Sequence, residues 1–305
     1  TPRQPKRAMI RKPCNYEYEL YTRHFRNGPS FPLLYQSKVV KNSDLDGNGF
    51  VEYTFEWMEP LLDGGVFDIF SGSKGGCFSS IVRADSFENL LLEATTFALH
   101  TLYGLFQLHE HLQVVHCDIS PENVMFSHMD DCWKLNDFGA SLKLEDSLNN
   151  ARKVGTENFI APESSRTGIF TKESDIYSLG SVLFLTFHLR LMFFLEMGDS
   201  DDEDSRRLER SRTPDANEFE TDYYSEHSKR KAHYVEFVGL VQKMIKSRPE
   251  LRPCAHDALK DFLNFFEKIQ EKDFVVYGSK KIIPLIRELQ NSNENETDEI
   301  PYVVG

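Results

Sequence analysis

The stretch VVHCDISPENVMF, residues 114–126, places an acid, Asp118, and an amide, Asn123, five residues apart between two apolar runs. The apolar runs predict short buried β segments, so that the polar residues between them lie in a turn held by the core. Taken alone, His116, Asp118 and Asn123 could be the polar residues of an ordinary turn. A carboxylate and an amide oxygen are also suited to proton transfer and to binding hard cations. The residues that follow downstream decide between these two interpretations.

The overall composition is that of an acidic globular protein. The chain has 305 residues, 40% of them hydrophobic, and its 35 Lys and Arg residues against 48 Asp and Glu residues give a formal net charge of −13. This length suffices for one large domain or two lobes. The negative charge argues against nucleic acids and anionic membranes as partners. We expect a protein or small-molecule substrate instead.

The cysteines and the N-terminal residues indicate an intracellular protein, in the cytoplasm or the nucleus. The five cysteines are odd in number, scattered, and never in C-x-x-C spacing. This pattern argues against a disulfide framework or a zinc site and fits a reducing compartment. The sequence opens with TPRQPKR, which does not resemble the basic and then apolar leader of a secretory signal.

The first third of the chain predicts a small β-containing region followed by a long helix. Residues 17–25, EYELYTRHF, have apolar side chains at helical spacing. Residues 33–40 and 50–58 have β character and flank a cluster of Asp, Asn and Gly, which predicts a hairpin. Residues 86–111 predict a long amphipathic helix with Ser86 as its N-cap.

Helical patterns dominate the rest of the chain after two short β-like runs, NVMF at 123–126 and WKLN at 133–136. The longest apolar run, residues 179–195, is short for a membrane span and contains a His and an Arg, so we expect a buried helix. Residues 197–230 form a polar, acidic insertion without apolar periodicity, which predicts a loop. Residues 290–305 form a polar tail.

A calcium loop is an alternative interpretation of DLDGNGFVEYTF, residues 44–55. Asp44, Asp46 and Asn48 occupy the first ligand positions of such a loop, but its last position holds Phe55 instead of a bidentate Glu. The flanking residues also have β character. A hairpin turn explains the same Asp, Asn and Gly residues through their tolerance of positive φ, and we prefer it.

Further motifs follow the opening stretch in a fixed order: D-F-G at 137–139, A-P-E at 161–163, SDIYSLG at 174–180, and Arg252 within RPELRP. In this order they resemble the protein kinase superfamily, over about residues 50–268. The resemblance implies an ATP- and Mg²⁺-dependent enzyme that phosphorylates protein substrates.

The fold implied by the resemblance is α+β and two-lobed, with a small β-rich N-lobe and a larger, mainly helical C-lobe. Residues 1–58 would form a partial N-lobe up to the hinge, and residues 59–270 the C-lobe, with the polar insertion at about 197–230. Residues 271–305 would form a C-terminal extension.

The resemblance also assigns roles to the opening stretch. Asp118 is the implied catalytic base that accepts the proton of the attacking hydroxyl. Asn123 and Asp137 are the implied Mg²⁺ ligands and so help to bind ATP. Phe138 would set the placement of Asp137 by packing, and His116 would pack under Phe138 without taking part in the chemistry.

Three polar residues of the implied C-lobe belong to the scaffold. Glu163 and Arg252 are expected to form an ion pair, and Asp175 a buried anchor beneath the catalytic turn.

The segment FEWME resembles the hinge between the two lobes. Phe55 would gate the back of the nucleotide pocket, while the carbonyl of Glu56 and the amide of Met58 would bond the adenine edge. Met125 would supply the apolar floor of the pocket. The segment after Met58, EPLLDGG, is longer than is usual in the family.

Two residues depart from the family pattern, and one keeps it. Cys117 stands where the catalytic loop commonly has an Arg that contacts a phosphate on the activation segment, so activation by phosphorylation is in question. Ser120 replaces the Lys typical of serine/threonine kinases, which removes a positive charge near the transferred phosphate. Thr156 matches the threonine that serine/threonine kinases place near the acceptor site, which favours Ser and Thr over Tyr as acceptors.

The larger departure is N-terminal, because no G-x-G-x-x-G loop precedes the hinge. Lys12 is our candidate for the phosphate-pairing lysine, with Arg11 and Lys6 as rivals. Its partner on the following helix would be Glu17 or Glu19, at an unusually short interval, and the apolar spacing behind Glu17 favours Glu17. Lys12 could equally be one member of a solvated basic cluster.

Two functions therefore remain open from the sequence. The first is an active kinase, directed to Ser and Thr, whose first strands lie upstream of Thr1 in the complete protein. The second is a pseudokinase, which keeps the fold as an interaction domain with weak nucleotide binding. The Asp118, Asn123 and Asp137 trio favours the first, and the missing Gly-rich loop and Ser120 favour the second.

Overall fold

A computed structural model shows the arrangement of the chain. It describes residues 8–10, 15–25, 29–43, 49–58, 87–127, 129–149, 151–188, 191, 228–270 and 281–294. Within residues 35–43 and 49–58 the backbone is described and the side chains are not.

The N-terminal region forms a three-stranded antiparallel sheet. Its strands are β1 (Ala8–Ile10), β2 (Leu34–Ser43) and β3 (Gly49–Met58), in the spatial order β1-β3-β2. Strands β2 and β3 pair along their full length, from Leu34 opposite Met58 to Ser43 opposite Gly49, so the predicted hairpin is confirmed. The calcium-loop residues between the two strands lie outside the described residues.

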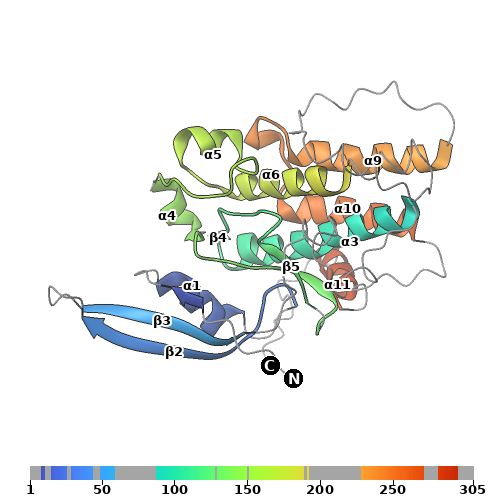
Figure 1. Cartoon of the computed structure of the whole chain (residues 1–305). Helices are drawn as coiled ribbons and strands as arrows, with labels where there is room; N and C mark the ends of the chain where they lie inside the picture. The colour runs from blue at the N-terminus through green and yellow to red at the C-terminus, as the bar shows by residue number, and fades with distance from the viewer. Residues whose placement is uncertain are drawn as a thin grey trace, which may run out of the picture.

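A short helix lies between β1 and β2 in the chain. It consists of α1 (Asn15–Glu19) and a π-helical turn, η1 (Leu20–His24), and it confirms the helix predicted over residues 17–25. Leu20, Tyr21 and Phe25 are all buried, because their helical spacing directs them to the same face. In Figure 1 this helix lies between the hairpin and the helical body.

The rest of the described chain is mainly helical. Its strands are short: β4 (Val114–Val115) pairs with β7 (Leu142–Lys143), and β5 (Val124–Ser127) pairs with β6 (Cys132–Leu135). Its helices are α3 (Phe87–Phe106) with η3 (Gln107–His111), α4 (Leu144–Asn149), α5 (Pro162–Thr167), α6 (Lys172–Leu183) with η4 (Phe184–His188), α9 (Ser228–Met244), η6 (Pro249–Leu251), α10 (Ala255–Ile269) and α11 (Ile282–Glu294).

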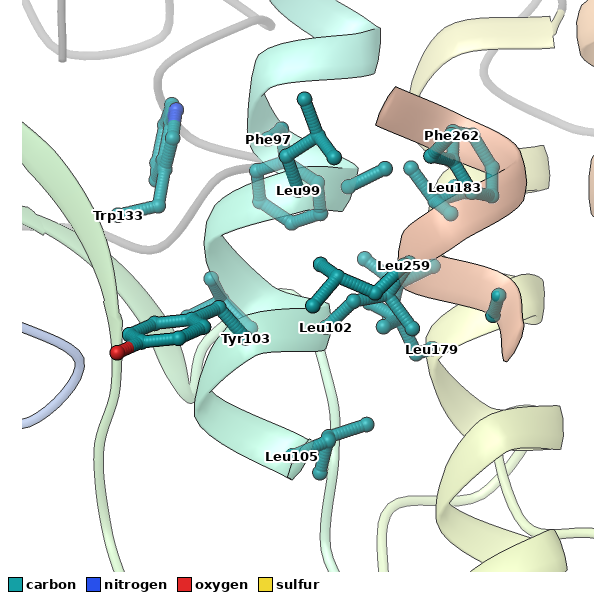
Figure 2. Packing of buried hydrophobic residues seen from close by; sticks show 14 of the residues in the cluster. Phe97, Leu99, Leu102, Tyr103, Leu105, Trp133, Leu179, Leu183, Leu259 and Phe262 are labelled. Atoms are coloured by element: carbon teal, nitrogen blue, oxygen red, sulfur yellow. The ribbon is translucent and has the colours of Figure 1, made fainter. Parts of the chain in front are cut away.

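Helix α3 is the central element of the helical body. The sequence predicts an amphipathic helix, but the side chains of α3 are buried around nearly its whole circumference. The reason is that α3 packs against α10, α6, α9 and the β5–β6 hairpin at once. Figure 2 shows Leu102 and Leu99 of α3 facing Leu179 and Leu183 of α6 and Leu259 of α10, with Trp133 on the opposite side.

The described part of the long apolar run is a buried helix, as predicted. Within it, residues 179–188 belong to α6 and η4, and their apolar side chains join the core that α3 organises. Among the described residues, every helix is too short or too polar to cross a membrane.

Helix α11 extends into residues that the sequence assigns to a polar tail. It runs to Glu294, and its first turns bury Ile282, Ile283 and Ile286 in the same core as α3. The overall α+β arrangement, with a small sheet region and a larger helical body, agrees with the predicted fold class. The exact lobe boundaries at residues 58 and 270 remain predictions.

Candidate active site

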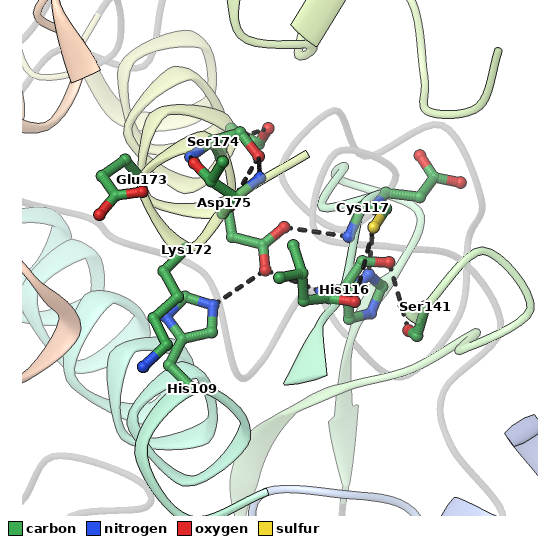
Figure 3. A network of polar contacts seen from close by, with 12 residues as sticks. His109, His116, Cys117, Ser141, Lys172, Glu173, Ser174 and Asp175 are labelled. Carbon is green, nitrogen blue, oxygen red and sulfur yellow. Dashed lines mark hydrogen bonds and ion pairs between the residues drawn. The ribbon is translucent and has the colours of Figure 1, made fainter. Parts of the chain in front are cut away.

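The turn between β4 and β5 is held from below by one buried carboxylate. Asp175 of α6 accepts hydrogen bonds from the backbone N–H of His116 (2.8 Å) and of Cys117 (3.0 Å), and it contacts Nε2 of His109 at 2.9 Å. Figure 3 shows these contacts converging on the Asp175 side chain. Cys117 has a φ of 69°, which is unfavourable for a residue with a Cβ. The two hydrogen bonds that Asp175 accepts from His116 and Cys117 offset this strain. The predicted anchor role of Asp175 is therefore confirmed.

The implied base, Asp118, is connected to the segment before A-P-E. The hydroxyl of Thr156 donates a hydrogen bond of 2.7 Å to Oδ1 of Asp118. Because a carboxylate can accept several hydrogen bonds, Asp118 can also accept a hydrogen bond from a further hydroxyl. Asp118 is only partly buried.

The Asn123 side chain is oriented by the same turn. Its Nδ2 donates to the backbone carbonyl of Asp118 at 2.9 Å, and its backbone N–H donates to the carbonyl of Ser120 at 3.1 Å. Because the amide nitrogen is engaged, the side-chain carbonyl oxygen is the group of Asn123 that can bind a cation. The backbone carbonyl of Asn123 accepts a bond of 2.9 Å from Asn136, the residue before Asp137. This bond holds the backbone that precedes Asp137 against that of Asn123.

Asp137 and Phe138 face opposite sides of the chain. Phe138 is fully buried, and its ring lies 4.6 Å from that of Phe25 and 4.9 Å from that of His116. Asp137 is exposed, has a φ of 59°, and accepts a hydrogen bond of 3.2 Å at Oδ1 from the backbone of Gly139. Burial of Phe138 thus leaves the Asp137 carboxylate on the solvent side of the chain. The prediction that His116 packs against Phe138 is confirmed.

The hydrogen bonds of His116 identify its neutral form. Nε2 lies 3.1 Å from the carbonyl of Asn136, which can only accept, and Nδ1 lies 3.4 Å from the N–H of Asp118, which can only donate. The proton is therefore on Nε2. Burial lowers the pKa of His116, although Asp175 and Asp118 oppose this shift. A neutral His that bridges the catalytic turn and the D-F-G segment is structural, as the sequence analysis proposes.

Glu17, and not Glu19, lies beside the D-F-G segment. Glu17 is 6% exposed. Burial and then the charge of Asp137 raise its pKa to about 7, while a backbone hydrogen bond from Phe138 opposes this. Glu19 instead forms an ion pair of 2.7 Å with Arg23 at the surface. The geometry therefore favours Glu17 as the partner of a phosphate-pairing cation.

The candidates for the phosphate-pairing cation are Lys12, Arg11 and Lys6, which lie outside the described residues. The strand β1 that precedes Lys12 does pair with β3, with Ala8 opposite Phe55.

The predicted hinge residues lie at the end of β3. Met58 is opposite Leu34, and the register shifts between Gln36 and Ser37, so that Glu56 lies at an irregularity of the ladder. Met125 lies on β5, where its sulfur accepts a hydrogen bond of 3.2 Å from the Asn136 side chain. The roles of Phe55, Glu56, Met58 and Met125 in binding adenine remain predictions.

Glu163 and Arg252 form the predicted scaffold ion pair. The Arg252 guanidinium contacts the two carboxylate oxygens of Glu163 at 2.6 and 2.9 Å, and it also donates to the carbonyl of Glu173. The Arg252 side chain is fully buried. This pair fixes the A-P-E segment against the region that follows α9.

The two departures from the family pattern are both buried. Cys117 is 4% exposed and lies in a small apolar cluster with Val115, Leu142 and Phe170. Ser120 is 1% exposed, and within the described part of the chain its hydroxyl has no hydrogen-bond partner. Neither side chain supplies a positive charge to the site.

The residues present fit a magnesium ion that arrives with a nucleotide. Among the described residues, no three His, Cys, Asp or Glu side chains gather closely enough to hold a metal ion. Mg²⁺ in phosphoryl-transfer sites is bound by one or two protein oxygens together with phosphates and water. The amide oxygen of Asn123 and the carboxylate of Asp137 supply such a pair.

One residue that contacts the D-F-G segment was not predicted from the sequence. The Tyr21 hydroxyl donates a hydrogen bond of 3.1 Å to Oδ1 of Asn136, and the Tyr21 ring lies 5.7 Å from that of Phe138. Tyr21 therefore joins the η1 turn to the D-F-G segment. Its apolar helical spacing indicated burial, but no local signal indicated its partner 115 residues away.

Comparison with known proteins agrees with this geometry. A family model described as a protein kinase domain matches residues 64–263. The chain is 24% identical over 189 residues to the probable serine/threonine-protein kinase gdt2 of Dictyostelium discoideum, an alignment that covers 58% of this chain and 11% of that protein.

Two further relatives match over shorter segments. The serine/threonine-protein kinase PrkC of Bacillus subtilis (strain 168) is 40% identical over 83 residues, which are 27% of this chain and 13% of PrkC. The mitogen-activated protein kinase kinase SIPKK of Nicotiana tabacum is 40% identical over 83 residues, which are 27% of this chain and 23% of SIPKK. The aligned part of the chain thus spans between 11% and 23% of the length of these relatives.

Proposed function

Because this chain belongs to the protein kinase family, we propose that it transfers the γ-phosphate of ATP to Ser and Thr hydroxyls of protein substrates. The relatives described as serine/threonine kinases support the choice of acceptor. We further propose that it acts inside the cell, where ATP is available. Its net charge of −13 makes nucleic acid an unfavourable partner.

The proposed mechanism assigns one task to each residue of the turn. Asp118 accepts the proton of the acceptor hydroxyl and orients its oxygen toward the phosphate. The Asn123 amide oxygen and the Asp137 carboxylate would hold the Mg²⁺ of the nucleotide. When bound, Mg·ATP would supply the phosphoryl group and offset the negative charge of the phosphates. Thr156 keeps the Asp118 carboxylate turned toward the acceptor side.

The observation that carries this proposal is a chain of two hydrogen bonds. Thr156 donates to the Asp118 side chain at 2.7 Å, and Asn123 donates to the Asp118 backbone at 2.9 Å. These bonds join the acceptor-side segment, the base and a metal ligand in one rigid unit. Such preorganisation is what phosphoryl transfer requires, because the protein contributes positioning and charge stabilisation.

A pseudokinase is the second candidate, and Ser120 is the observation that favours it. The buried Ser120 hydroxyl cannot supply the positive charge that the family places near the transferred phosphate. Under this alternative, the fold would serve as an interaction domain with weak nucleotide binding and without transfer.

The experiment that separates the two is transfer of radiolabelled phosphate from ATP to a generic protein substrate. The parent chain, Asp118→Asn and an exposed control, Asp257→Asn, would be compared at equal concentration. We expect Asp118→Asn to lose roughly 10²–10⁴-fold in rate and the control to match the parent. Equal transfer by the parent and Asp118→Asn would refute the kinase proposal, and no transfer by the parent would favour the pseudokinase.

A further inference from the structure

The two proposed metal ligands lie at the open end of one hairpin. Strands β5 and β6 pair from Val124 opposite Leu135 to Ser127 opposite Cys132. Asn123 comes immediately before β5, and Asp137 follows β6 after one residue. The backbone bond from Asn136 to Asn123 closes this end at 2.9 Å. Any shift of the hairpin therefore moves both ligands.

Two lysines meet one carboxylate at the closed end of the hairpin. Asp130 accepts hydrogen bonds from Lys134 at 2.5 Å and from Lys281. The Lys134 side chain is fully buried and that of Lys281 is 53% exposed. Burial raises the pKa of Asp130, but the hydrogen bonds and charges of the two lysines outweigh it and bring the pKa below its usual value. Asp130 is therefore a charged link between the hairpin and Lys281.

Lys281 belongs to an element outside the matched kinase domain. The family model ends at residue 263, whereas Lys281 immediately precedes α11. Helix α11 is docked firmly, because Ile282 and Ile286 are both fully buried in the main core and Arg287 pairs with Glu267 of α10 at 3.1 Å. In Figure 1, α11 lies below α3, against which it packs.

We propose that Lys281 is a positioning residue for nucleotide binding, through its ion pair with Asp130. A two-stranded hairpin is only marginally stable by itself, so its geometry depends on what holds each end. Packing of Trp133 against Phe97 of α3 holds the middle, and Lys281 fastens the tip to the docked helix α11. The C-terminal extension thereby sets how well Asn123 and Asp137 are placed for Mg·ATP. This inference rests on the proposed nucleotide site.

The test compares three variants of the full chain. Lys281→Met removes the ion pair, Lys281→Arg keeps the charge, and Arg287→Met removes a comparable exposed ion pair from the same helix without touching the hairpin. The first measurement is amide hydrogen exchange at Leu135 and Asn136, whose N–H groups bond Ser30 and Asn123. The second is the dissociation constant for Mg·ADP by calorimetry.

We expect Lys281→Met to raise both the exchange rates at these amides and the dissociation constant by about fivefold, the most that an ion pair near the surface usually contributes. Lys281→Arg should restore both values, and Arg287→Met should leave both unchanged. Unchanged exchange in Lys281→Met would overturn the inference, as would faster exchange with unchanged binding. If the parent itself does not bind Mg·ADP, the proposed nucleotide site fails, whereas the exchange measurement still decides whether Lys281 holds the hairpin.

Discussion

The Thr156 hydroxyl donates a hydrogen bond of 2.7 Å to Oδ1 of Asp118, across 38 residues of sequence. The bond can form because the chain turns back sharply at Gly155, whose φ of 96° suits a residue without a Cβ. A Cβ at Gly155 would lie 2.9 Å from Ile160 and 3.2 Å from the carbonyl of Cys117. The segment that carries Thr156 thus packs directly against the turn that contains Cys117 and Asp118.

Replacing Thr156 tests this bond. We expect Thr156→Val to lower the rate of phosphate transfer about tenfold or more, because a hydrogen bond to a charged group contributes about 1.5–3 kcal/mol. Thr156→Ser should retain most of the rate, since it keeps the hydroxyl. The control is Thr167→Val, which removes an exposed hydroxyl bonded to a helix carbonyl. Equal rates for Thr156→Val and the parent would show that the bond does not position Asp118.

Replacing Asp175 tests the support of the catalytic turn. An Asn at this site keeps one acceptor oxygen, so its NH2 group would face one of the two backbone N–H donors, that of His116 or that of Cys117. We expect Asp175→Asn to lower the free energy of unfolding by about 2–4 kcal/mol, as for other buried charge networks. Denaturant titration beside the exposed control Asp257→Asn measures this. A loss no larger than that of the control would contradict the anchor role.

Breaking the Glu163–Arg252 pair should also be costly. Because the Arg252 side chain is fully buried, Arg252→Met leaves the Glu163 carboxylate without its bidentate partner. The expected loss of unfolding free energy is about 3–5 kcal/mol. Lys268→Met, which removes an exposed pair between α10 and Glu236, should cost less than about 1 kcal/mol. Similar losses in the two variants would show that burial of the pair does not matter.

His188 makes stability depend on acid pH. Burial lowers the pKa of His188 from 6.5 to about 4, and the imidazole faces the Tyr234 hydroxyl at 2.7 Å. Between these two pH values the unfolded chain binds a proton that the folded chain does not, so stability present above pH 6.5 is lost as the pH falls toward 4. The loss amounts to about 3 kcal/mol.

A variant without the imidazole isolates this effect. In His188→Gln the free energy of unfolding should fall less steeply between pH 6.5 and 4 than in the parent. Denaturant titrations at several pH values measure the slope, with the exposed His24→Gln as control. An unchanged slope in His188→Gln would mean that His188 does not titrate in this way.

Features set by local sequence could be predicted. The β2–β3 hairpin followed from its turn cluster, and the catalytic turn from the order of its motifs. The packing of His116 against Phe138 was also predicted, from the resemblance to the kinase family, and the two rings lie 4.9 Å apart.

Features set by distant partners could not be predicted. The apolar spacing favoured Glu17 over Glu19, but the location of Glu17 beside the D-F-G segment depends on how its helix packs. The contact of Lys281 with Asp130 joins residues 151 positions apart. Helix α11 was not predicted, because its last residues belong to the polar stretch 290–305. Three isoleucines at its start dock it into the core.

The most direct test of the central claim is calorimetric titration of ATP into the chain with and without Mg²⁺. If Asn123 and Asp137 hold the metal of the nucleotide, Mg²⁺ should tighten binding of ATP to the parent about tenfold or more, by adding two charge-assisted contacts. Asp137→Asn should abolish this gain while leaving Mg²⁺-free binding unchanged. Binding by the parent that is the same with and without Mg²⁺ would contradict the account.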